Sequence, residues 1–439
     1  MNLSNRKVAI LGAQRSGLAL AKLVLCAGGI PKLSEKSDLS SLCAETLTWI
    51  KKNKVPFEHG GHTQGFIEGS DLVVLSPGVR FDSSIVSWAK NENIPVLGEI
   101  EFSSQFCEAP IIAVTGSNGK TTTVTLIHQV LVKAGIRSCL CGNVGIPFAE
   151  VVLSSKKYDH VVLEVSSFQL ESLLPLKSPF RKKKRRNDLC FKGFAPRISV
   201  ILNVNQNHLD RHKDMEEYFA SKSMIFLNQG KNDLAVLNFQ DQRLKALKSK
   251  IKPKICFFND PKLRNIFGIT NPNQLAVLEV AEALKIDPKI VVKVLKGFKG
   301  VEHRLEFVRE LAGVVYINDS KATTTESGRW ALNSFDQPIV MICGGRDKNM
   351  DFTVLSHIVK QKVRKMIVIG EAKEKIMNSF KNVVDVNECK TLEDAVLHAR
   401  KVAQRGDCVL FAPMCTSFDM FKDFEDRGRK YKTIVNGLK

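Results

Sequence analysis

Short apolar runs alternate with longer helical patterns from one end of the chain to the other. Residues 7–12, 110–115 and 408–411 have the length and composition of buried strands, and residues 16–27 and 274–284 have helical patterns. Strands buried on both faces and connected by helices are typical of parallel sheets. The sequence therefore predicts an α/β fold with mostly parallel sheets.

The length of 439 residues allows two to four domains, each large enough to bury its own core. A polar stretch at residues 103–108 and a glycine-flanked segment at residues 297–300 are the candidate boundaries. We expect three domains, at residues 1–106, 107–299 and 300–439.

Cysteine usage and hydropathy favour a cytoplasmic protein. The 11 cysteines are scattered and include no C-x-x-C pair, so reduced thiols are expected. The apolar stretch at residues 8–13 is interrupted by Arg15 and is too short for a signal peptide or a membrane span. We therefore expect a soluble cytoplasmic chain that does not interact with membranes.

The chain carries a formal charge of +20, and part of this charge is local. Residues 177–192 contain eight basic residues and one acidic residue. Such a run is typical of a solvated loop, and we expect a disordered one that is not part of the active site. The competing interpretation is a nucleic-acid-binding ATPase, but aromatic residues do not alternate with the basic ones.

A glycine-rich loop follows the strand at residues 110–115 and opens a helical pattern at residues 122–133. It reads TGSNGKTTT, and Val114 stands where the usual phosphate-binding loop has its first glycine. Backbone N–H groups of such a loop bind phosphates, a lysine reaches the terminal phosphates and a threonine ligates Mg²⁺. The predicted ATP-binding residues are therefore Gly116, Ser117, Asn118, Gly119, Lys120, Thr121 and Thr122.

A second glycine turn, Gly12-Ala-Gln-Arg-Ser-Gly17, follows the first strand. Gln14 occupies the position of the middle glycine of a dinucleotide fingerprint, which disfavours a dehydrogenase. Two interpretations remain, a turn that holds a phosphate-bearing ligand and a turn with only a structural role.

Glu164 and His208 follow two further predicted strands. The carboxyl ends of parallel strands meet at one edge of a sheet, so a carboxylate and an imidazole are expected beside the phosphate loop. Phosphate-linked Mg²⁺ needs few protein ligands. The pair therefore predicts a metal site, although a lone histidine at such a place is more often a hydrogen-bonded loop residue.

Six segments together resemble the Mur ligase family, the ATP-dependent amide-forming enzymes of peptidoglycan assembly. They are TGSNGKTT, LEVSSFQLE, NVNQNHLDRH, VEHRLE, INDSKAT and SFDMFKDFEDRG, in the order in which the family has them. The resemblance implies a Rossmann-like N-terminal domain for a UDP-sugar, a central P-loop ATPase domain and a Rossmann-like C-terminal domain for an amino acid. The segments LEVSSFQL and SFDMF favour members that add D-glutamate to UDP-N-acetylmuramoyl-L-alanine.

The resemblance also assigns roles to individual residues. Lys120, His208 and Lys222 are implied as catalytic, and Lys222 matches a lysine that the family carbamylates. Thr121, Glu164, His208 and Lys222 are implied as ligands of two Mg²⁺ ions, and Asn271, Arg304 and Asp319, with Lys321 in the same motif, as further ATP-site residues. The implied UDP-sugar contacts are Arg15, Ser16, Ser76, Pro77, Gly78 and Asn143, and the implied D-glutamate pocket is Thr323, Lys348, Ser417 and Phe424.

The sequence departs from the family pattern at two places. Thr270 and Gln274 replace a histidine and an asparagine that flank the position of Asn271, so only Asn271 is expected at the adenine. Residues 35–37 read Glu-Lys-Ser where some relatives have Thr-Arg near the uracil.

The implied reaction is ligation through an acyl phosphate. A carboxylate is a poor electrophile, so it first attacks the γ-phosphate of ATP, and the amine of D-glutamate then attacks the acyl phosphate. Lys120 and Mg²⁺ offset the charge repulsion. The alternative within this chemistry is a folylpolyglutamate synthetase-like ligase, which lacks the SSFQL segment. We expect a monomer whose partners are its small-molecule substrates.

Overall fold

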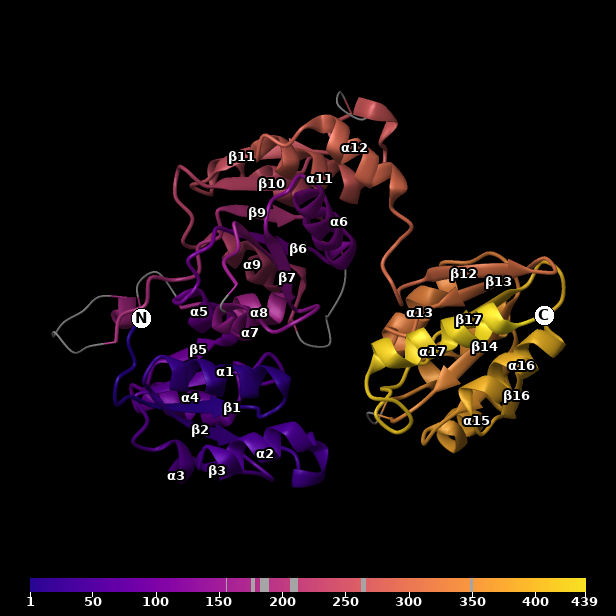
Figure 1. Cartoon of the computed structure of the whole chain (residues 1–439), viewed down its shortest axis with the longest axis horizontal. Coiled ribbons are helices and arrows are strands. Elements are labelled where there is room, and N and C mark those ends of the chain that lie inside the picture. The colour runs from indigo at the N-terminus through magenta and orange to yellow at the C-terminus, as the bar shows by residue number, and fades with distance from the viewer. Residues whose placement is uncertain (155, 175–177, 182–188, 206–211, 262–265, 348–349) are drawn as a thin grey trace. The chain divides into compact units, whose positions relative to one another are not determined.

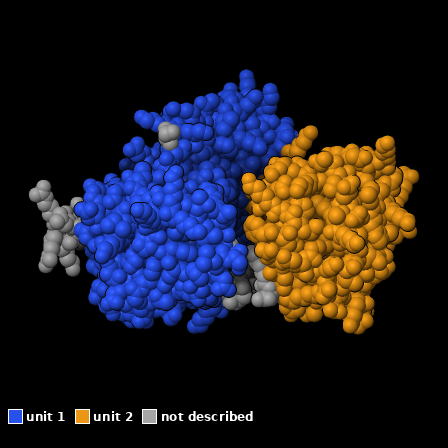
Figure 2. All heavy atoms as spheres, turned by 60° about the horizontal axis from the view of Figure 1, so that its bottom comes forward, with its two compact units in different colours: residues 1–298 blue, residues 299–439 orange. Residues whose placement is uncertain are grey.

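The computed structural model describes residues 1–439 apart from 155, 175–177, 182–188, 206–211, 262–265 and 348–349. The chain divides into two compact units, residues 1–298 and 299–439 (Figure 2). The break falls in the segment that the sequence predicts as a linker. Unit 1 contains two sheets and unit 2 contains one (Figure 1). The division into three domains, with a boundary at residues 106 and 107, stays a prediction.

The first sheet has five parallel strands in the order β3-β2-β1-β4-β5. They are β1 (Lys7–Leu11), β2 (Ile30–Ser34), β3 (Phe57–Glu58), β4 (Leu72–Leu75) and β5 (Val96–Gly98). The accompanying helices are α1 (Arg15–Cys26), α2 (Ala44–Lys52), α3 (Gln64–Ile67), α4 (Ser84–Asn91) and α5 (Glu99–Ser104). Alternate side chains of β1 and β4 enter two cores on opposite faces, as expected for strands buried on both sides.

The second sheet has six parallel strands in the order β11-β10-β9-β6-β8-β7. They are β6 (Ile111–Thr115), β7 (Ser138–Gly142), β8 (His160–Glu164), β9 (Ile198–Ile201), β10 (Leu234–Asn238) and β11 (Lys254–Phe258). After β6 the chain crosses to the far edge at β7, whereas after β9 it continues to β10 in the opposite direction. The carboxyl ends of the neighbouring strands β6 and β9 therefore form a topological switch point, where such sheets bind ligands.

Helices cover both faces of this second sheet. One face packs against α6 (Lys120–Lys133), α11 (Pro272–Ala283) and α12 (Pro288–Gly297). The other face packs against α7 (Phe148–Leu153), α8 (Ser167–Glu171), α9 (Met215–Ser223) and α10 (Gln242–Lys245). Both layers are visible in Figure 1.

Unit 2 has a six-stranded sheet in the order β12-β13-β17-β14-β15-β16. Its strands are β12 (Glu306–Leu311), β13 (Val314–Asn318), β14 (Ile339–Gly344), β15 (Val363–Ile369), β16 (Asp385–Glu388) and β17 (Cys408–Phe411). Only β12, at the edge, runs antiparallel to its neighbour. One core includes α13 (Thr325–Asn333), α14 (Ser356–Lys362) and α15 (Lys373–Phe380), and the other includes α16 (Leu392–Val402) and α17 (Phe424–Gly437).

The sheets confirm the predicted α/β class with mostly parallel strands. All eleven cysteines are free thiols. Among the described residues, no helix combines the length and apolar character that crossing a membrane requires.

The basic run at residues 177–192 differs from the solvated loop that its charge predicts. Its described ends are anchored by apolar side chains, because Phe191 is 1% exposed and Phe180 and Leu189 pack around the same core of the first sheet. The N–H of Phe191 donates to the carbonyl of Phe180 at 3.1 Å, and the N–H of Lys192 donates to Gln105 Oε1 at 2.9 Å. The prediction of a disordered run was wrong for these ends, because the charge content concealed one buried and two partly buried apolar side chains.

We predict that Phe191→Ala destabilises the chain by about 3 kcal/mol, as for other large-to-small changes in a packed core. Urea unfolding followed by tryptophan fluorescence measures this loss, since Trp49 borders the same core. Lys192 is the next residue, and its side chain is exposed. The free energy of unfolding of Lys192→Ala should therefore stay within about 0.5 kcal/mol of that of the parent chain. Equal midpoints for Phe191→Ala and the parent would contradict the anchoring role.

Candidate active site

The predicted phosphate loop connects β6 to α6 at the switch point of the second sheet. Gly119 adopts a left-handed conformation, with φ of 82°, immediately before the first turn of α6. A Cβ atom at this position would be strained by the backbone conformation and would lie 2.3 Å from Asn273 Oδ1, so glycine is favoured here. The loop therefore presents the N-terminal end of a 14-residue helix, which favours anionic groups.

Residues that follow β9, and one residue of α9, hold the loop in its conformation. The N–H groups of Ser117 and Asn118 donate to the carbonyl and side-chain oxygens of Asn203 at 3.0 and 2.9 Å. The Ser117 hydroxyl donates to the Asn205 carbonyl at 3.0 Å and lies 3.1 Å from the Tyr218 hydroxyl. These three partners were not among the predicted site residues.

Two signals in the sequence point to these missed residues. Asn203 follows β9, the strand next to β6, and neighbouring parallel strands end at the same edge. Tyr218 precedes Lys222 by four residues on α9, which places both side chains on one helical face.

Lys120 and Lys222 converge on one backbone oxygen. The Nζ atom of Lys120 donates to the carbonyls of Gly116 and Ser117 at 2.9 and 3.1 Å. The Nζ atom of Lys222, from α9, donates to the same Gly116 carbonyl at 3.0 Å. The structure thus brings two of the predicted catalytic lysines to the phosphate loop from separate elements.

Lys222 is almost completely buried, at 1% exposure, and its Nζ atom lies 4.4 Å from the centre of the Tyr218 ring. Burial, and secondarily the positive charge of Lys120, lower the pKa of Lys222 to about 6. At neutral pH Lys222 is therefore largely a neutral amine with a free electron pair.

Glu164 ends β8, and its backbone pairs with Val114 of β6. Its side chain is buried, and Oε1 accepts a hydrogen bond from Asn143 Nδ2 at 2.9 Å. Its other oxygen, Oε2, is also buried but accepts no hydrogen bond from the described residues. A buried carboxylate oxygen without a donor suits a cation ligand.

The predicted metal ligands are only partly described. Thr121 is buried at the start of α6, whereas His208 lies outside the described residues. Within the described part of the chain, no group of three or more His, Cys, Asp or Glu side chains is arranged to hold a metal ion. Glu164 is thus the one described carboxylate of the predicted metal site.

The predicted UDP-sugar residues lie after β4, at the start of α1 and after β7. The hydroxyl of Ser76 donates to the Gly12 carbonyl at 3.3 Å, and Pro77 and Gly78 are exposed beside it. Arg15, at the start of α1, donates to the Gly145 carbonyl at 3.3 Å and lies 3.8 Å from Glu150. Ser16 is half-buried in the same turn. Arg15 thus connects α1, beside the first sheet, to the segment that follows β7 of the second sheet. In that segment Asn143 bonds to Glu164.

Asn271 has a structural role that its prediction as an adenine contact did not include. Its side-chain oxygen caps α11, accepting from the N–H groups of Asn273 and Gln274 at 2.9 and 3.4 Å. Within this helix, the side chain that lies against the phosphate loop is Asn273, which faces Gly119. Gln274 donates to the carbonyl of Leu295, away from the loop residues.

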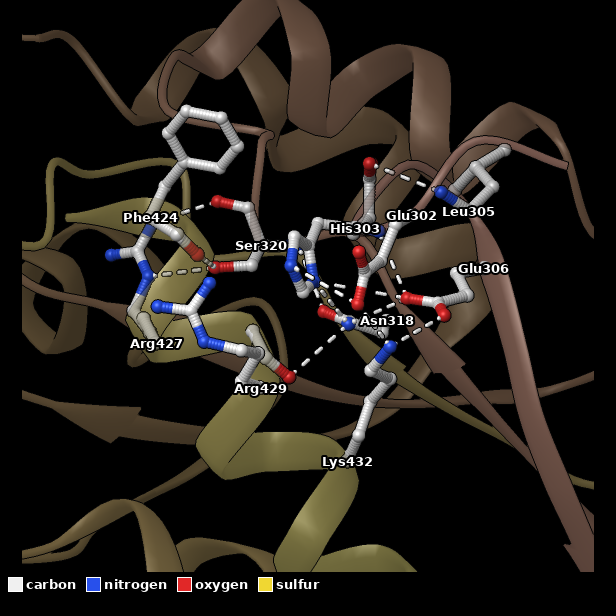
Figure 3. Close-up of polar contacts among 12 residues, drawn as sticks. Glu302, His303, Leu305, Glu306, Asn318, Ser320, Phe424, Arg427, Arg429 and Lys432 are labelled. Atoms are coloured by element: carbon white, nitrogen blue, oxygen red, sulfur yellow. Dashed lines mark hydrogen bonds and ion pairs between the residues drawn. The ribbon is translucent and has the colours of Figure 1, made fainter. Parts of the chain in front are cut away.

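In unit 2, Arg304 and Asp319 are close neighbours. The N–H of Leu305 donates to Asp319 Oδ1 at 3.2 Å, and the N–H of Lys321 donates to the carbonyl of His303 at 3.1 Å (Figure 3 shows the first of these bonds). Burial raises the pKa of Asp319 to about 6. The segment that contains Arg304 is thus joined to the INDSKAT segment.

The described residues of the predicted D-glutamate pocket border the same segment. Phe424 begins α17, and its carbonyl accepts from the Ser320 hydroxyl at 2.8 Å. Ser417 is buried, and Thr323 is half-buried two residues after Lys321. Lys348 lies outside the described residues.

Arg427 is a residue that sequence reasoning missed. Its guanidinium is buried in unit 2 and donates to the carbonyls of Ser320 and Cys415 at 2.8 and 3.1 Å. It therefore joins the loops before Thr323 and Ser417. Figure 3 shows Arg427 beside Ser320. Arg427 belongs to the segment SFDMFKDFEDRG, but the family resemblance was not used to assign it a role.

Comparisons with known proteins now identify the family. Residues 114–267 match the family profile described as "Mur ligase middle domain", and residues 303–415 match "Mur ligase, glutamate ligase domain". The chain belongs to the Mur ligase family. This confirms the resemblance inferred from the six sequence segments.

The curated relatives match over their full length. A protein from Pelodictyon phaeoclathratiforme, named UDP-N-acetylmuramoylalanine--D-glutamate ligase, is 37% identical over 483 residues, which cover 100% of this chain and 99% of the relative. A protein of the same name from Geotalea uraniireducens is 35% identical, with 100% and 99% covered. One from Thermoanaerobacter sp. is 37% identical, with both chains fully covered.

Solved structures support the fold of this Mur ligase. UDP-N-acetylmuramate-alanine ligase MurC from Thermotoga maritima superposes with a TM-score of 0.53 at 18% identity, covering 99% of this chain and 100% of the other. MurF from Acinetobacter baumannii gives a TM-score of 0.52 at 15% identity, covering 84% and 87%. At these identities the likeness concerns the fold alone.

We predict that Lys222 makes the stability of this Mur ligase depend on pH. The unfolded chain binds the Lys222 proton up to about pH 10.4, whereas the folded chain loses it near pH 6, so stability increases with pH between these values. Lys222→Met removes the buried amine and should remove this dependence. Urea unfolding of the parent chain and of Lys222→Met in CO₂-free buffer from pH 6 to pH 10 measures the difference in their pH dependence. Parallel profiles of unfolding free energy against pH would contradict a lowered pKa of Lys222.

Proposed function

We propose that this chain joins D-glutamate to UDP-N-acetylmuramoyl-L-alanine and converts ATP to ADP and phosphate. The observation that carries the proposal is the full-length match to relatives with that named activity. The arrangement of the phosphate loop, with Lys120 and Lys222 on one carbonyl beside the buried Glu164, suits phosphoryl transfer to a carboxylate.

The reaction proceeds in two steps. A carboxylate oxygen of the UDP-linked substrate attacks the γ-phosphorus of ATP, which forms an acyl phosphate and releases ADP. The amine of D-glutamate then attacks the acyl carbon, loses a proton and expels phosphate. The loop N–H groups and Lys120 bind the phosphates and offset negative charge as the phosphoryl group moves.

Two Mg²⁺ ions fit the residues of this site. Thr121, Glu164, His208 and a modified Lys222 would hold them, and the unpaired Glu164 Oε2 supports this assignment. When bound, Mg²⁺ neutralises charge on the triphosphate and on the incoming carboxylate. His208, as a further catalytic residue, positions that carboxylate.

Carbamylation of Lys222 resolves a conflict in the site. Two ammonium groups that share the Gly116 carbonyl would repel each other in a buried place. The neutral Lys222 amine instead attacks CO₂, forms a C–N bond and loses one proton. The product is an anionic oxygen ligand next to Lys120.

The remaining assignments follow the same scheme. Asn271, Arg304 and Asp319 serve ATP, and Arg15, Ser16, Ser76, Pro77, Gly78 and Asn143 serve the UDP-sugar. Thr323, Lys348, Ser417 and Phe424 receive D-glutamate. Residues 1–106, 107–299 and 300–439 form the three corresponding domains of a monomeric, cytoplasmic enzyme.

The decisive experiment measures phosphate release by the purified chain with ATP and Mg²⁺. We expect turnover only when UDP-N-acetylmuramoyl-L-alanine and D-glutamate are both present. Lys120→Ala should lower kcat by about 10²–10³, as for other residues that stabilise developing charge. Lys133→Ala, an exposed change at the other end of α6, is the matched control.

Two outcomes argue against this proposal. Equal turnover with L-glutamate would exclude the D-glutamate assignment, and turnover with a folate substrate would favour the polyglutamate-forming alternative. An active Lys120→Ala enzyme would show that the loop does not carry the chemistry.

The carbamate has a direct spectroscopic test. Equilibration with ¹³C-bicarbonate should give one carbamate signal in the ¹³C NMR spectrum of the parent chain and of Lys231→Ala, whose substituted side chain is exposed. The signal should be absent from Lys222→Ala, which should be almost inactive and partly rescued by a short carboxylate. Persistence of the signal in Lys222→Ala would refute the modification at this residue.

A further inference from the structure

The segment from Val301 to Leu305 opens unit 2 in a strained conformation. His303 and Leu305, on either side of Arg304, both adopt positive φ angles, 62° and 43°. Such backbone angles are uncommon for residues other than glycine. Each such residue costs about 1 kcal/mol relative to an ordinary conformation. The direction of Arg304 therefore depends on contacts that hold its two neighbours.

Glu306 supplies one such contact from the start of β12. Its Oε2 atom accepts the N–H of His303 at 2.9 Å and the side-chain amide of Asn318 at 3.0 Å. Asn318 is completely buried, and its amide also lies 2.9 Å from His303 Nδ1. The carboxylate of Glu306 thus fixes the backbone and, through Asn318, the ring of His303.

Helix α17 closes this arrangement from the other side. Gly428 lies so close to His303 that a Cβ atom there would be 2.2 Å from His303 Nδ1. One turn further, Lys432 Nζ donates to Glu302 Oε1 at 2.5 Å and to Glu306 Oε1 at 2.9 Å (Figure 3). Lys432 is thereby bonded to one carboxylate within the strained segment, Glu302, and to another directly after it, Glu306.

The two carboxylates differ in what they need from Lys432. Glu302 is more than half exposed, so its ion pair with Lys432 alone would contribute little to the stability of the segment. Glu306 is only 18% exposed and already bonded on its other oxygen, so Lys432 completes the set of donors around a mostly buried charge. Loss of Lys432 leaves Glu306 short of a donor and Glu302 without its partner.

We propose that Lys432 is a positioning residue that holds the Val301–Leu305 segment, and with it Arg304, in the strained conformation. Lys432 acts through Glu302 and Glu306. The segment carries the arginine assigned above to ATP, so the catalytic part of this inference rests on the proposed function. The conformational part depends only on contacts within unit 2.

Limited trypsin digestion tests the conformational part without reference to activity. Cleavage after Arg304, followed by mass spectrometry, should be about tenfold faster in Lys432→Met, which corresponds to 1.4 kcal/mol in the free energy of local opening. Lys432→Arg should restore slow cleavage. Lys430→Met removes a charge from the same helix, where Lys430 pairs with Asp426 at 3.3 Å, and should behave like the parent chain.

Steady-state kinetics test the link to ATP. In Lys432→Met we expect the KM for ATP to rise about tenfold, which corresponds to 1.4 kcal/mol of binding free energy. The kcat and the KM for D-glutamate should stay within about twofold of the parent values. The melting temperature identifies a folding defect. A parent chain that does not ligate D-glutamate would refute the proposed function and leave the digestion experiment to decide the role of Lys432.

Three results would overturn the role of Lys432. The first is an unchanged rate of cleavage after Arg304 in Lys432→Met. The second is an equal effect of Lys430→Met and Lys432→Met. The third is a rise in both KM values together with a fall in kcat and in the melting temperature. The last would mark Lys432 as a general stabilising residue.

Discussion

Strand β6 is hydrogen-bonded on both sides, and the arrangement of the active site depends on that pairing. Its neighbours β8 and β9 end at the same edge of the sheet, so Glu164, the last residue of β8, and Asn203, two residues after β9, lie beside the phosphate loop. Helix α9 then adds Tyr218 and Lys222 from a separate part of the chain. No single segment contains the site, and the parallel pairing assembles it.

The parts of the fold that were predictable have local signals. The strand, glycines and lysine around Lys120 are contiguous, and the break at residues 298 and 299 falls in a glycine-flanked segment. The family resemblance, which rests on six short segments, assigned roles to residues far from these local signals. Its assignments of individual site residues stay predictions, although Lys120 and Lys222 do meet at the Gly116 carbonyl.

The features that were not predictable depend on tertiary contacts. Phe191 lies in a strongly basic run yet belongs to the core of the first sheet. Asn271 caps a helix, while Asn273, two residues later, faces the phosphate loop. Lys432 and Glu302 are separated by 130 positions, and neither stands out by composition. Charge and spacing along the chain do not reveal such pairs.

The hydrogen bonds between Ser117 and Asn203 also concern the order of synthesis. The loop leaves the ribosome long before its supports, because β9 and the following asparagines are some 85 residues further along. Until they emerge, the loop has its complete sequence but lacks the bonds that shape it, and β6 lacks one of its two neighbours. A nascent chain that ends before Asn203 is thus a phosphate-binding sequence without a phosphate-binding structure.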